Sequence, residues 1–483
     1  MADSELKRKT AKGLFWGGLG NGGMQLLNLA FGIVLSRILT PGDYGVIGAL
    51  TIFSAVAGIF SESGFTLAIV NRRDIDRRDY SSVFWFNITV GAVLYIALFF
   101  FARPIAAFYR TPEMVPLARF LFMSFFFGAL GTAPSGYLLK NLKIKQRSKS
   151  LIIAVTVSGT VGVVCALNGM AYWGIAIQTV SYSLVYNLLL WHFSALRIGF
   201  EFSWKTITEM FPFSVRQLTV ALFNHFNNNF FAALLGRFYG MVTTGFYTQG
   251  NKWTTMGYST LSGMIGSVGQ PVLRQTVDDH DRTVRVFRKL LRFMAFLSFP
   301  AMFGLAIVSR ELIVISVTAK WLEAVPVMHI LCIGGAFIPI STLYGNLFNS
   351  IGRPGIYMWN TVCIGLVQTG AILLTYGGGL YFMLRIYVAV NIGWLSVWQF
   401  FAYRTIGLRL RHLLADILPS LIGAVVVMAV TLLLTRSIAE PVVSLLVKIP
   451  VAAVLYTVLM WTVDSEMIQE AIGFFRKNKN DEY

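Results

Sequence analysis

Charged residues are scarce in this chain. Only 13% of its 483 residues are Asp, Glu, Lys or Arg, and 56% are hydrophobic. A soluble protein usually carries about a quarter charged residues, so too few are present to cover a surface that faces water. Long hydrophilic stretches are missing as well, and the longest connections between apolar runs, around 102–115 and 309–323, are short. They leave little room for a catalytic domain outside a membrane, and we expect that the chain is not an enzyme.

Cysteine is rare too. Cys165, Cys332 and Cys363 all fall inside apolar runs and show no Cys-x-x-Cys spacing, so neither a disulfide framework nor a metal site is expected. We also expect no cofactor. A cleavable signal peptide is not expected, because the first apolar run is long and Gly-rich and no small-residue cleavage site follows it.

What the chain has instead is a series of apolar runs of 18 or more residues, which is typical of a polytopic all-α membrane protein. Breaks at charged residues predict about fourteen transmembrane helices. We expect them near 13–35, 44–70, 81–101, 116–138, 149–168, 171–193, 208–235, 241–269, 287–308, 324–349, 355–375, 380–402, 413–435 and 441–463.

The formal net charge of the chain is +18, and its Lys and Arg residues are unevenly divided between the two sides of the membrane. If the N-terminus is cytoplasmic, the inner segments carry 28 of the 40 Lys and Arg residues. The outer segments carry seven: Arg37, Arg103, Arg110, Arg237, Arg310, Lys320 and Arg436. This asymmetry predicts a multi-pass protein with both termini in the cytoplasm. Because most of the basic charge is explained in this way, we expect no nucleic-acid partner.

A faint internal repeat divides the chain. "LSRILTPGDYGVI" at 35–47 and "LGRFYGMVTTGFY" at 235–247 align at an offset of 200, which places Leu35, Arg37 and Gly45 on Leu235, Arg237 and Gly245. Six helices separate the copies, so they have the same orientation, as in transporters that bind substrate between two lobes. We expect a lobe of six helices at 1–205, a second at 206–405, and two further helices with a cytoplasmic tail at 406–483, with a central cavity between the lobes.

Five basic residues remain inside the predicted spans: Arg119, Arg216, Lys252, Arg385 and Lys448. One acid, Glu62 in "FSESGF", clearly accompanies them. Ionisable residues within a membrane usually face a bundle interior or an aqueous cavity, so some of these cations need water or an anionic ligand. We expect Lys448 to reach the interface, and we expect a site role for Lys252. For Arg119 and Arg385, reaching the interface and lining a cavity are both open.

Arg216 is the strongest candidate for a site residue. At 100° per residue, Gln217, Asn224, Asn227 and Asn228 lie within about 120° of Arg216 on one helix. Such a polar stripe predicts the wall of a hydrated cavity, and the alternative is a network of hydrogen bonds between helices. Arginine suits phosphate because its planar fork makes paired, charge-assisted hydrogen bonds.

Several stretches resemble a known family. "RILTPGDYGVIGALTIFSAVAGIFSESGFTLAIVNRRDIDRRDYSSVFWFN" at 37–87 is similar to the opening of the bacterial polysaccharide transporters, which are flippases of lipid-linked oligosaccharides. These belong to the multidrug/oligosaccharidyl-lipid/polysaccharide exporter superfamily. "PFSVRQ", "LLGRFYGMVTTGFY" and "AVPVMHILCIGGAFIPISTLYGNLFNSIGRPG" fit the same family. The resemblance extends in order to about residue 405.

The resemblance implies two six-helix lobes with two extra helices in a bacterial cytoplasmic membrane. It also implies a substrate, an oligosaccharide linked through diphosphate to undecaprenol, which is flipped to the outer leaflet for O-antigen, capsule or exopolysaccharide assembly. Arg216, Lys252 and Arg385 would then hold the diphosphate while the polyprenyl tail stays among the membrane lipids. Proton or sodium coupling is an expectation for such proteins, and Glu62 is its candidate here, although it could equally pair with an arginine.

Three alternatives remain open. A drug or metabolite/cation antiporter of the same superfamily should carry acids in its cavity, which the five basic residues argue against. A peptidoglycan-precursor flippase would use the same diphosphate. A membrane enzyme of the same pathway would need an acidic or His-containing site, and "TVDDHDRTVR" at 276–285 has the pattern of an ordinary solvated surface.

Overall fold

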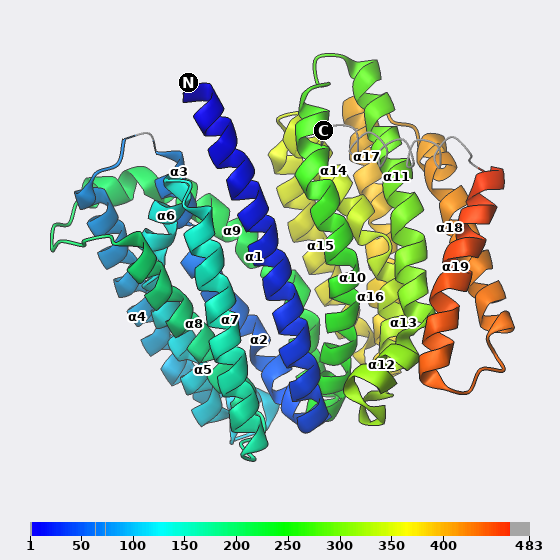
Figure 1. Ribbon diagram of the computed structural model, residues 1–483, viewed down its shortest axis with the longest axis horizontal. Helices are drawn as coiled ribbons and strands as arrows, with labels where there is room; N and C mark the ends of the chain where they lie inside the picture. Colours follow the sequence, from blue (N-terminus) through cyan, green and yellow to red (C-terminus); the bar gives the residue numbers. More distant parts are fainter. Residues whose placement is uncertain (1, 63, 73, 464–483) are drawn as a thin grey trace. The chain divides into compact units, whose positions relative to one another are not determined.

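The computed structural model describes residues 2–62, 64–72 and 74–463 (Figure 1). For 2–15, 54–62, 216, 217, 220, 267 and 268 it describes the backbone but not the side chain. Helices account for the regular structure, and no strand occurs in these ranges. The chain divides into two compact units, Met1–Gly245 and Phe246–Tyr483. The division into lobes near residues 205 and 405 stays a prediction.

The first unit contains nine helices and the beginning of a tenth. They are α1 Ala2–Ile38, α2 Pro41–Glu62, α3 Phe65–Asn71, α4 Arg77–Tyr109, α5 Met114–Ala129, α6 Thr132–Lys140, α7 Ile144–Leu167, α8 Trp173–Ser194, α9 Trp204–Phe238 and the start of α10 Gly240–Arg274. Within this unit α7 packs on α1 and α8, and α9 packs on α2 and α4.

The second unit takes in the rest of α10 and the helices that follow. They are α11 His280–Ile307, α12 Ser309–Val317, α13 Ala324–Gly335, α14 Ile338–Ser350, α15 Pro354–Thr375, α16 Leu380–Gly393, α17 Leu395–Ile406, α18 Leu410–Leu434 and α19 Pro441–Val463, with short 3₁₀ turns at Ala319–Trp321 and Tyr376–Gly378. Its core is aromatic, because Phe287, Tyr344 and Trp398 pack together among α11, α14 and α17.

Local sequence explains where several helices begin. The side chain of Asp76 accepts a hydrogen bond from the backbone N–H of Asp79 at 2.8 Å, at the start of α4. Asp279 accepts one from Arg282 N–H at 2.9 Å, at the start of α11. Each aspartate satisfies a donor that the first helical turn leaves without an intrahelical partner.

The prediction of an all-α membrane protein is confirmed. Every segment predicted as a span is covered by one helix or by two consecutive helices. By length and hydropathy, nine helical stretches among the described residues can cross a membrane, or ten if α5 and α6, which meet at 41°, form one span. The count of fourteen is not confirmed. The shortfall includes α9 and α10, whose many Asn, Gln, Thr and Gly residues lower the mean hydropathy.

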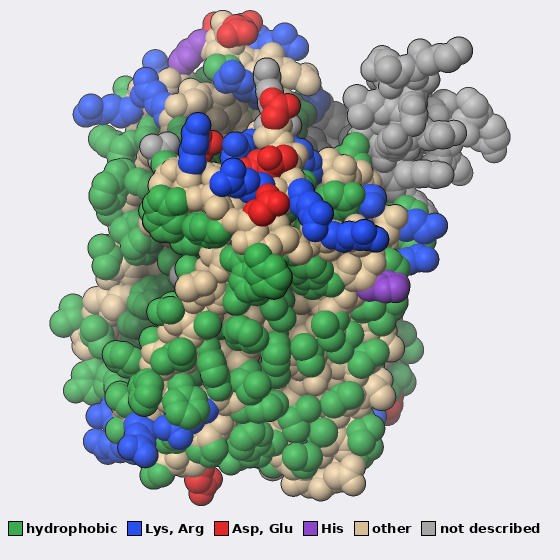
Figure 2. All heavy atoms as spheres, turned by 90° about the vertical axis from the view of Figure 1, so that its left-hand side faces the viewer, with side chains coloured by type: hydrophobic (Ala, Val, Ile, Leu, Met, Phe, Trp, Pro, Cys, Tyr) green, Lys and Arg blue, Asp and Glu red, His purple; other side chains and the backbone are tan. Residues whose placement is uncertain are grey.

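The surface has the division expected of helices that cross an apolar layer. On the face shown in Figure 2, hydrophobic side chains form a broad band. Most of the visible Lys, Arg, Asp and Glu gather above this band, and a smaller group, mostly Lys and Arg, lies below it. A band of this kind suits lipid, since membrane-facing helices need no polar cover.

Candidate functional site

The polar stripe predicted on 208–235 lies on α9, in the first unit. Asn224 and Asn227 are half-buried and Asn228 is exposed. The side chains of Arg216 and Gln217 lie outside the described residues, although both positions are helical. In the same stretch of α9 the rings of Phe226 and Phe230 stack, with their centroids 4.6 Å apart.

Lys252 and Arg385 belong to the second unit, on α10 and α16. The side chain of Lys252 is half-buried and makes no hydrogen bond or ion pair with the described part of the chain. Arg385 is exposed and is likewise without an acidic partner among the described residues. These two cations are therefore open to a ligand.

Lys448 does not turn to the surface, and that expectation is wrong. Its side chain is buried, with the residue 9% exposed, and its Nζ pairs with Glu311 of α12. Ser444 Oγ also donates to Glu311, at 2.8 Å. The reason is that the carboxylate of Glu311 lies opposite Lys448, and a buried cation is far more stable beside a carboxylate than alone. We therefore assign Lys448 to the packing of α12 against α19.

Arg119 has local partners in the first unit. Its Nε donates to the carbonyl oxygen of Phe99 at 3.3 Å. Its guanidinium carbon lies 4.0 Å from the centre of the Phe99 ring, a cation–π contact. These contacts hold Arg119 against α4.

Sequence reasoning missed a buried acid in the second unit. Asp416 of α18 is 1% exposed and accepts from Arg288 Nε at 2.8 Å and from a terminal nitrogen of Arg288 at 2.9 Å. Arg292 adds a third contact at 3.2 Å. Asp416 falls four residues into the predicted span 413–435, so checking every span for acids would have found it. Glu62 is therefore not the one clear intramembrane acid, and its side chain lies outside the described residues.

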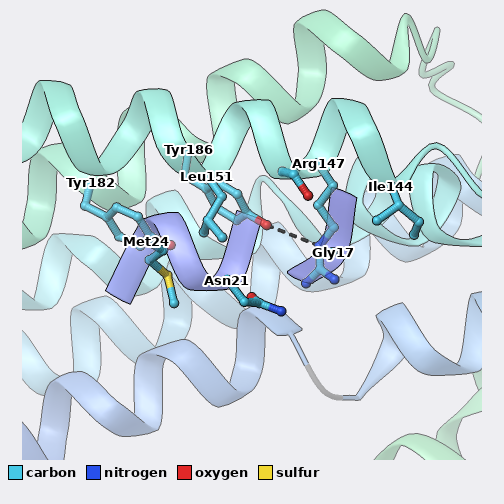
Figure 3. A pocket seen from close by; sticks show the side chains of 9 residues that line it. Gly17, Asn21, Met24, Ile144, Arg147, Leu151, Tyr182 and Tyr186 are labelled. Carbon is cyan, nitrogen blue, oxygen red and sulfur yellow. Dashed lines mark hydrogen bonds between the residues drawn. The ribbon is translucent and has the colours of Figure 1, made fainter. Parts of the chain in front are cut away.

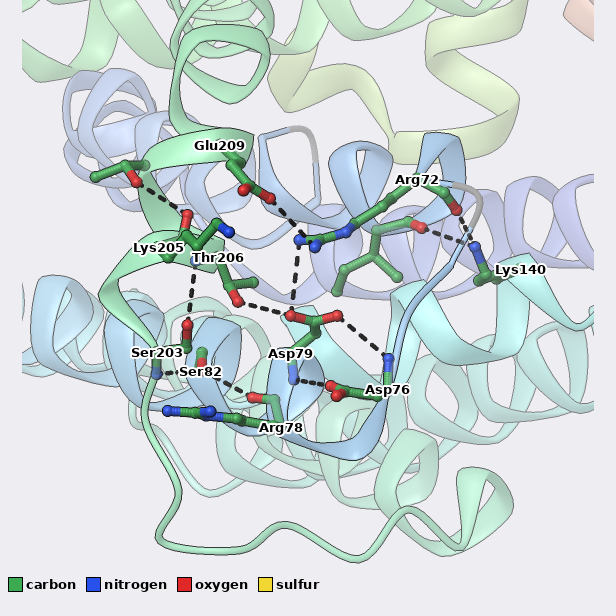
Figure 4. Close-up of polar contacts among 12 residues, drawn as sticks. Arg72, Asp76, Arg78, Asp79, Ser82, Lys140, Ser203, Lys205, Thr206 and Glu209 are labelled. Atoms are coloured by element: carbon green, nitrogen blue, oxygen red, sulfur yellow. Dashed lines mark hydrogen bonds and ion pairs between the residues drawn. The ribbon is translucent and has the colours of Figure 1, made fainter.

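A second missed network joins α9 to the α3–α4 junction in the first unit (Figure 4). The guanidinium of Arg72 lies 3.2 Å from Glu209 and 3.6 Å from Asp79, in each case nitrogen to carboxylate oxygen. The hydroxyl of Thr206 donates to Asp79 at 2.6 Å. Lys140 Nζ donates to the carbonyl oxygen of Arg72. The first turns of α9 are thereby tied to α3, α4 and α6.

These contacts show which charged residues have a partner of opposite charge. Among the residues whose side chains are described, the buried acids Asp79, Glu311 and Asp416 all meet a cation. No described acid forms an ion pair with Lys252 or Arg385. No cluster of three metal-ligating side chains occurs there either. Chemically, the unpaired cations suit an anionic group.

The fold is similar to those of two solved membrane-protein structures. The chain is similar to the structure of the lipid II flippase MurJ in an inward closed conformation, with a TM-score of 0.75, 14% identity, and coverage of 94% of this chain and 99% of that one. It is also similar to an inward-facing multidrug resistance MATE family transporter, with a TM-score of 0.63, 18% identity, and coverage of 80% and 94%.

Residues 34–326 match the family described as "Polysaccharide biosynthesis protein", and the chain belongs to this family. It is 25% identical to the lipopolysaccharide biosynthesis protein WzxC of Escherichia coli (strain K12), over 77% of this chain and 78% of that protein. It is 23% identical to the succinoglycan biosynthesis transport protein ExoT of Rhizobium meliloti (strain 1021), over 92% and 91%. The teichuronic acid biosynthesis protein TuaB of Bacillus subtilis (strain 168) is 23% identical, over 80% and 79%.

Proposed function

We propose that this protein flips an undecaprenyl-diphosphate-linked oligosaccharide from the inner to the outer leaflet of a bacterial cytoplasmic membrane, for polysaccharide assembly. The observation that carries the proposal is which charged side chains have a partner of opposite charge. Buried acids in both units are paired, whereas Lys252 and Arg385 have no described acidic partner. A diphosphate is the anion that would compensate them.

In this proposal the chain has both termini in the cytoplasm and works by alternating access of two lobes, without being an enzyme. Lys252 and Arg385 contact the diphosphate together with Arg216. The amides of Gln217, Asn224, Asn227 and Asn228 keep the path for the sugars hydrated. Arg119 can line the cavity only if its side chain leaves Phe99. We therefore expect Arg119 to contribute least to substrate binding. Glu62 is the candidate for binding a coupling proton or sodium ion.

The fold alone does not choose among the functions of the superfamily, because lipid flippases and drug transporters both share it. The sign of the charges at the binding site does distinguish lipid flippases from transporters of cationic drugs. A cavity that binds cationic drugs would place unpaired acids on its walls, whereas the candidate contacts Lys252 and Arg385 are basic. A peptidoglycan-precursor flippase would share the diphosphate, and the relatives named for polysaccharide biosynthesis favour the first proposal.

A binding experiment tests the proposal. Purified protein is mixed with undecaprenyl-diphosphate-linked oligosaccharide, with lipid II, or with a lipophilic cation. We expect the first ligand to bind most tightly, and Lys252→Gln and Arg385→Gln each to weaken it about tenfold, which is 1.4 kcal/mol. Arg436→Gln, which removes an exposed arginine beyond the end of α18, is the matched control and should change nothing. Tight binding of the cation alone would refute the proposal.

A further inference from the structure

A cavity of about 310 Å³ lies among α1, α7 and α8, all within the first unit (Figure 3). It is separate from the stripe on α9, and none of the candidate site residues lines it. Its walls are Gly17, Asn21 and Met24 from α1, Ile144, Arg147, Ser148 and Leu151 from α7, and Tyr182 and Tyr186 from α8.

Arg147 is held in place at the wall of this cavity. Its Nε donates to the hydroxyl of Tyr186 at 3.3 Å, the bond drawn in Figure 3. Tyr186 in turn stacks on Tyr182, one helical turn away, with ring centroids 5.7 Å apart and planes within 5°. The guanidinium is therefore positioned by a rigid aromatic pair and is half-buried. A fixed arginine fork is well suited to a phosphate group.

Arg147 is the one charged residue among the nine that line the cavity. Asn21 and Arg147 supply hydrogen-bond donors from α1 and α7, whereas the hydroxyl of Ser148 already donates to the carbonyl oxygen of Trp16 at 2.7 Å. None of the nine lining residues is acidic. An anion would therefore meet no like charge on these walls.

Neighbouring lysines have different tasks. Lys140 donates to backbone carbonyls, Lys143 lies 4.9 Å from the centre of the Tyr137 ring, and Lys145 lies 5.0 Å from that of Trp16. They raise the local positive potential, while Arg147 is the basic group that lines the cavity.

The level of the cavity in the membrane points to a lipid. Arg147 is in the first turn of α7, directly after the basic loop that ends α6. In the proposed orientation this loop is cytoplasmic, so Arg147 lies at the level of the headgroups of the inner leaflet. Basic pockets between transmembrane helices on the cytoplasmic side are characteristic binding places for phosphate-bearing lipid headgroups.

We propose that this cavity is a binding site for the diphosphate headgroup of a polyprenyl lipid in the inner leaflet, with Arg147 as the phosphate contact and Tyr186 as its positioning residue. The inference rests on the proposed function, since it assigns to the substrate a first binding place apart from Lys252 and Arg385. The prenyl chain stays in the surrounding lipid. The side-chain amide of Asn21 donates to an outer oxygen of the headgroup.

The test measures lipid binding to the full-length protein in nanodiscs of neutral lipid, with undecaprenyl diphosphate as the probe. We expect Arg147→Gln to weaken binding at least tenfold and Arg147→Lys to recover part of it, because charge returns without the fork. Tyr186→Phe should give an intermediate loss, because the ring remains but the hydrogen bond to Arg147 is removed. Lys149→Gln is the matched control: it removes the same charge from an exposed position two residues away, outside the cavity.

Each outcome decides something. Equal binding by Arg147→Gln and Lys149→Gln, with both proteins folded by size-exclusion chromatography, overturns the site. Displacement of the probe by equimolar cardiolipin would make the cavity a general anionic-lipid site and overturn the diphosphate assignment. Equal affinity for inorganic diphosphate would overturn the role of the lipid. If the wild type binds no undecaprenyl-diphosphate species, the proposed function itself fails, whereas loss of Arg147 dependence alone refutes only this inference.

Discussion

Gly45 of α2 and Gly245 of α10 make reciprocal contacts with each other's helix. A Cβ atom at Gly45 would lie 1.7 Å from the carbonyl oxygen of Met241, and one at Gly245 would lie 1.8 Å from that of Pro41. Each glycine meets the residue four positions before the other glycine. The repeat offset of 200 relates Gly45 to Gly245 and also Pro41 to Met241. The faint repeat in the sequence thus coincides with a nearly symmetric contact inside the first unit.

Alanine at either glycine should therefore be destabilising. Alanine normally favours a helix over glycine by about 0.5–1 kcal/mol, but here its Cβ would collide with backbone atoms that cannot rotate away. We expect Gly45→Ala and Gly245→Ala each to cost about 1–3 kcal/mol, seen as a lower midpoint of thermal unfolding in detergent. Gly42→Ala is the control, because the nearest atom to its Cβ would be 3.7 Å away. Equal midpoints for the three variants would contradict this account of the contact.

The same contact has a consequence for transport. α2 belongs to the predicted first lobe and α10 to the second, so alternating access requires the two helix beginnings to part in one state. A Cβ at Gly42 would lie 3.9 Å from a methyl group of Val242, so cysteine side chains at these two positions would approach each other, as a disulfide requires. We expect Gly42→Cys with Val242→Cys, in a chain lacking Cys165, Cys332 and Cys363, to stop transport on oxidation. Reductant should restore it, and transport that continues through complete cross-linking would show that this contact stays closed.

Asp416 provides a test of the second unit. Replacing it with asparagine keeps its shape but leaves Arg288 and Arg292 without their carboxylate. Breaking a fully buried pair costs about 3–5 kcal/mol. Both arginines are about one-third exposed, at 30% and 34%, so we expect a smaller loss of about 2 kcal/mol. Arg285→Ala, on the same helix but exposed, should leave the unfolding midpoint unchanged, and a similar drop in both variants would argue against a specific role for Asp416.

The helical segments were predictable because hydrophobic runs and charged breaks are local features of a chain. The pairing of charges was not. Glu311 lies in what the sequence marks as an outer connection, and its partner Lys448 follows 137 positions later. Nothing local brings those two together, since the packing of α12 on α19 does so. Arg72 and Glu209 are likewise brought together only by helix packing, so the sequence did not reveal their ion pair. The cations at Lys252 and Arg385 could be found from the sequence because they stand inside predicted spans that hold few other charged residues.

Translocation of a labelled substrate tests the proposed flippase activity directly. Purified protein is reconstituted in vesicles that contain undecaprenyl-diphosphate oligosaccharide labelled on the sugar with a fluorophore that dithionite quenches from outside. We predict that the protein makes the inner pool of label accessible, and that replacing both Lys252 and Arg385 with glutamine abolishes this while the Arg436→Gln control retains it. Label that stays protected, in vesicles where the same protein transports a lipophilic cation, would contradict the assignment.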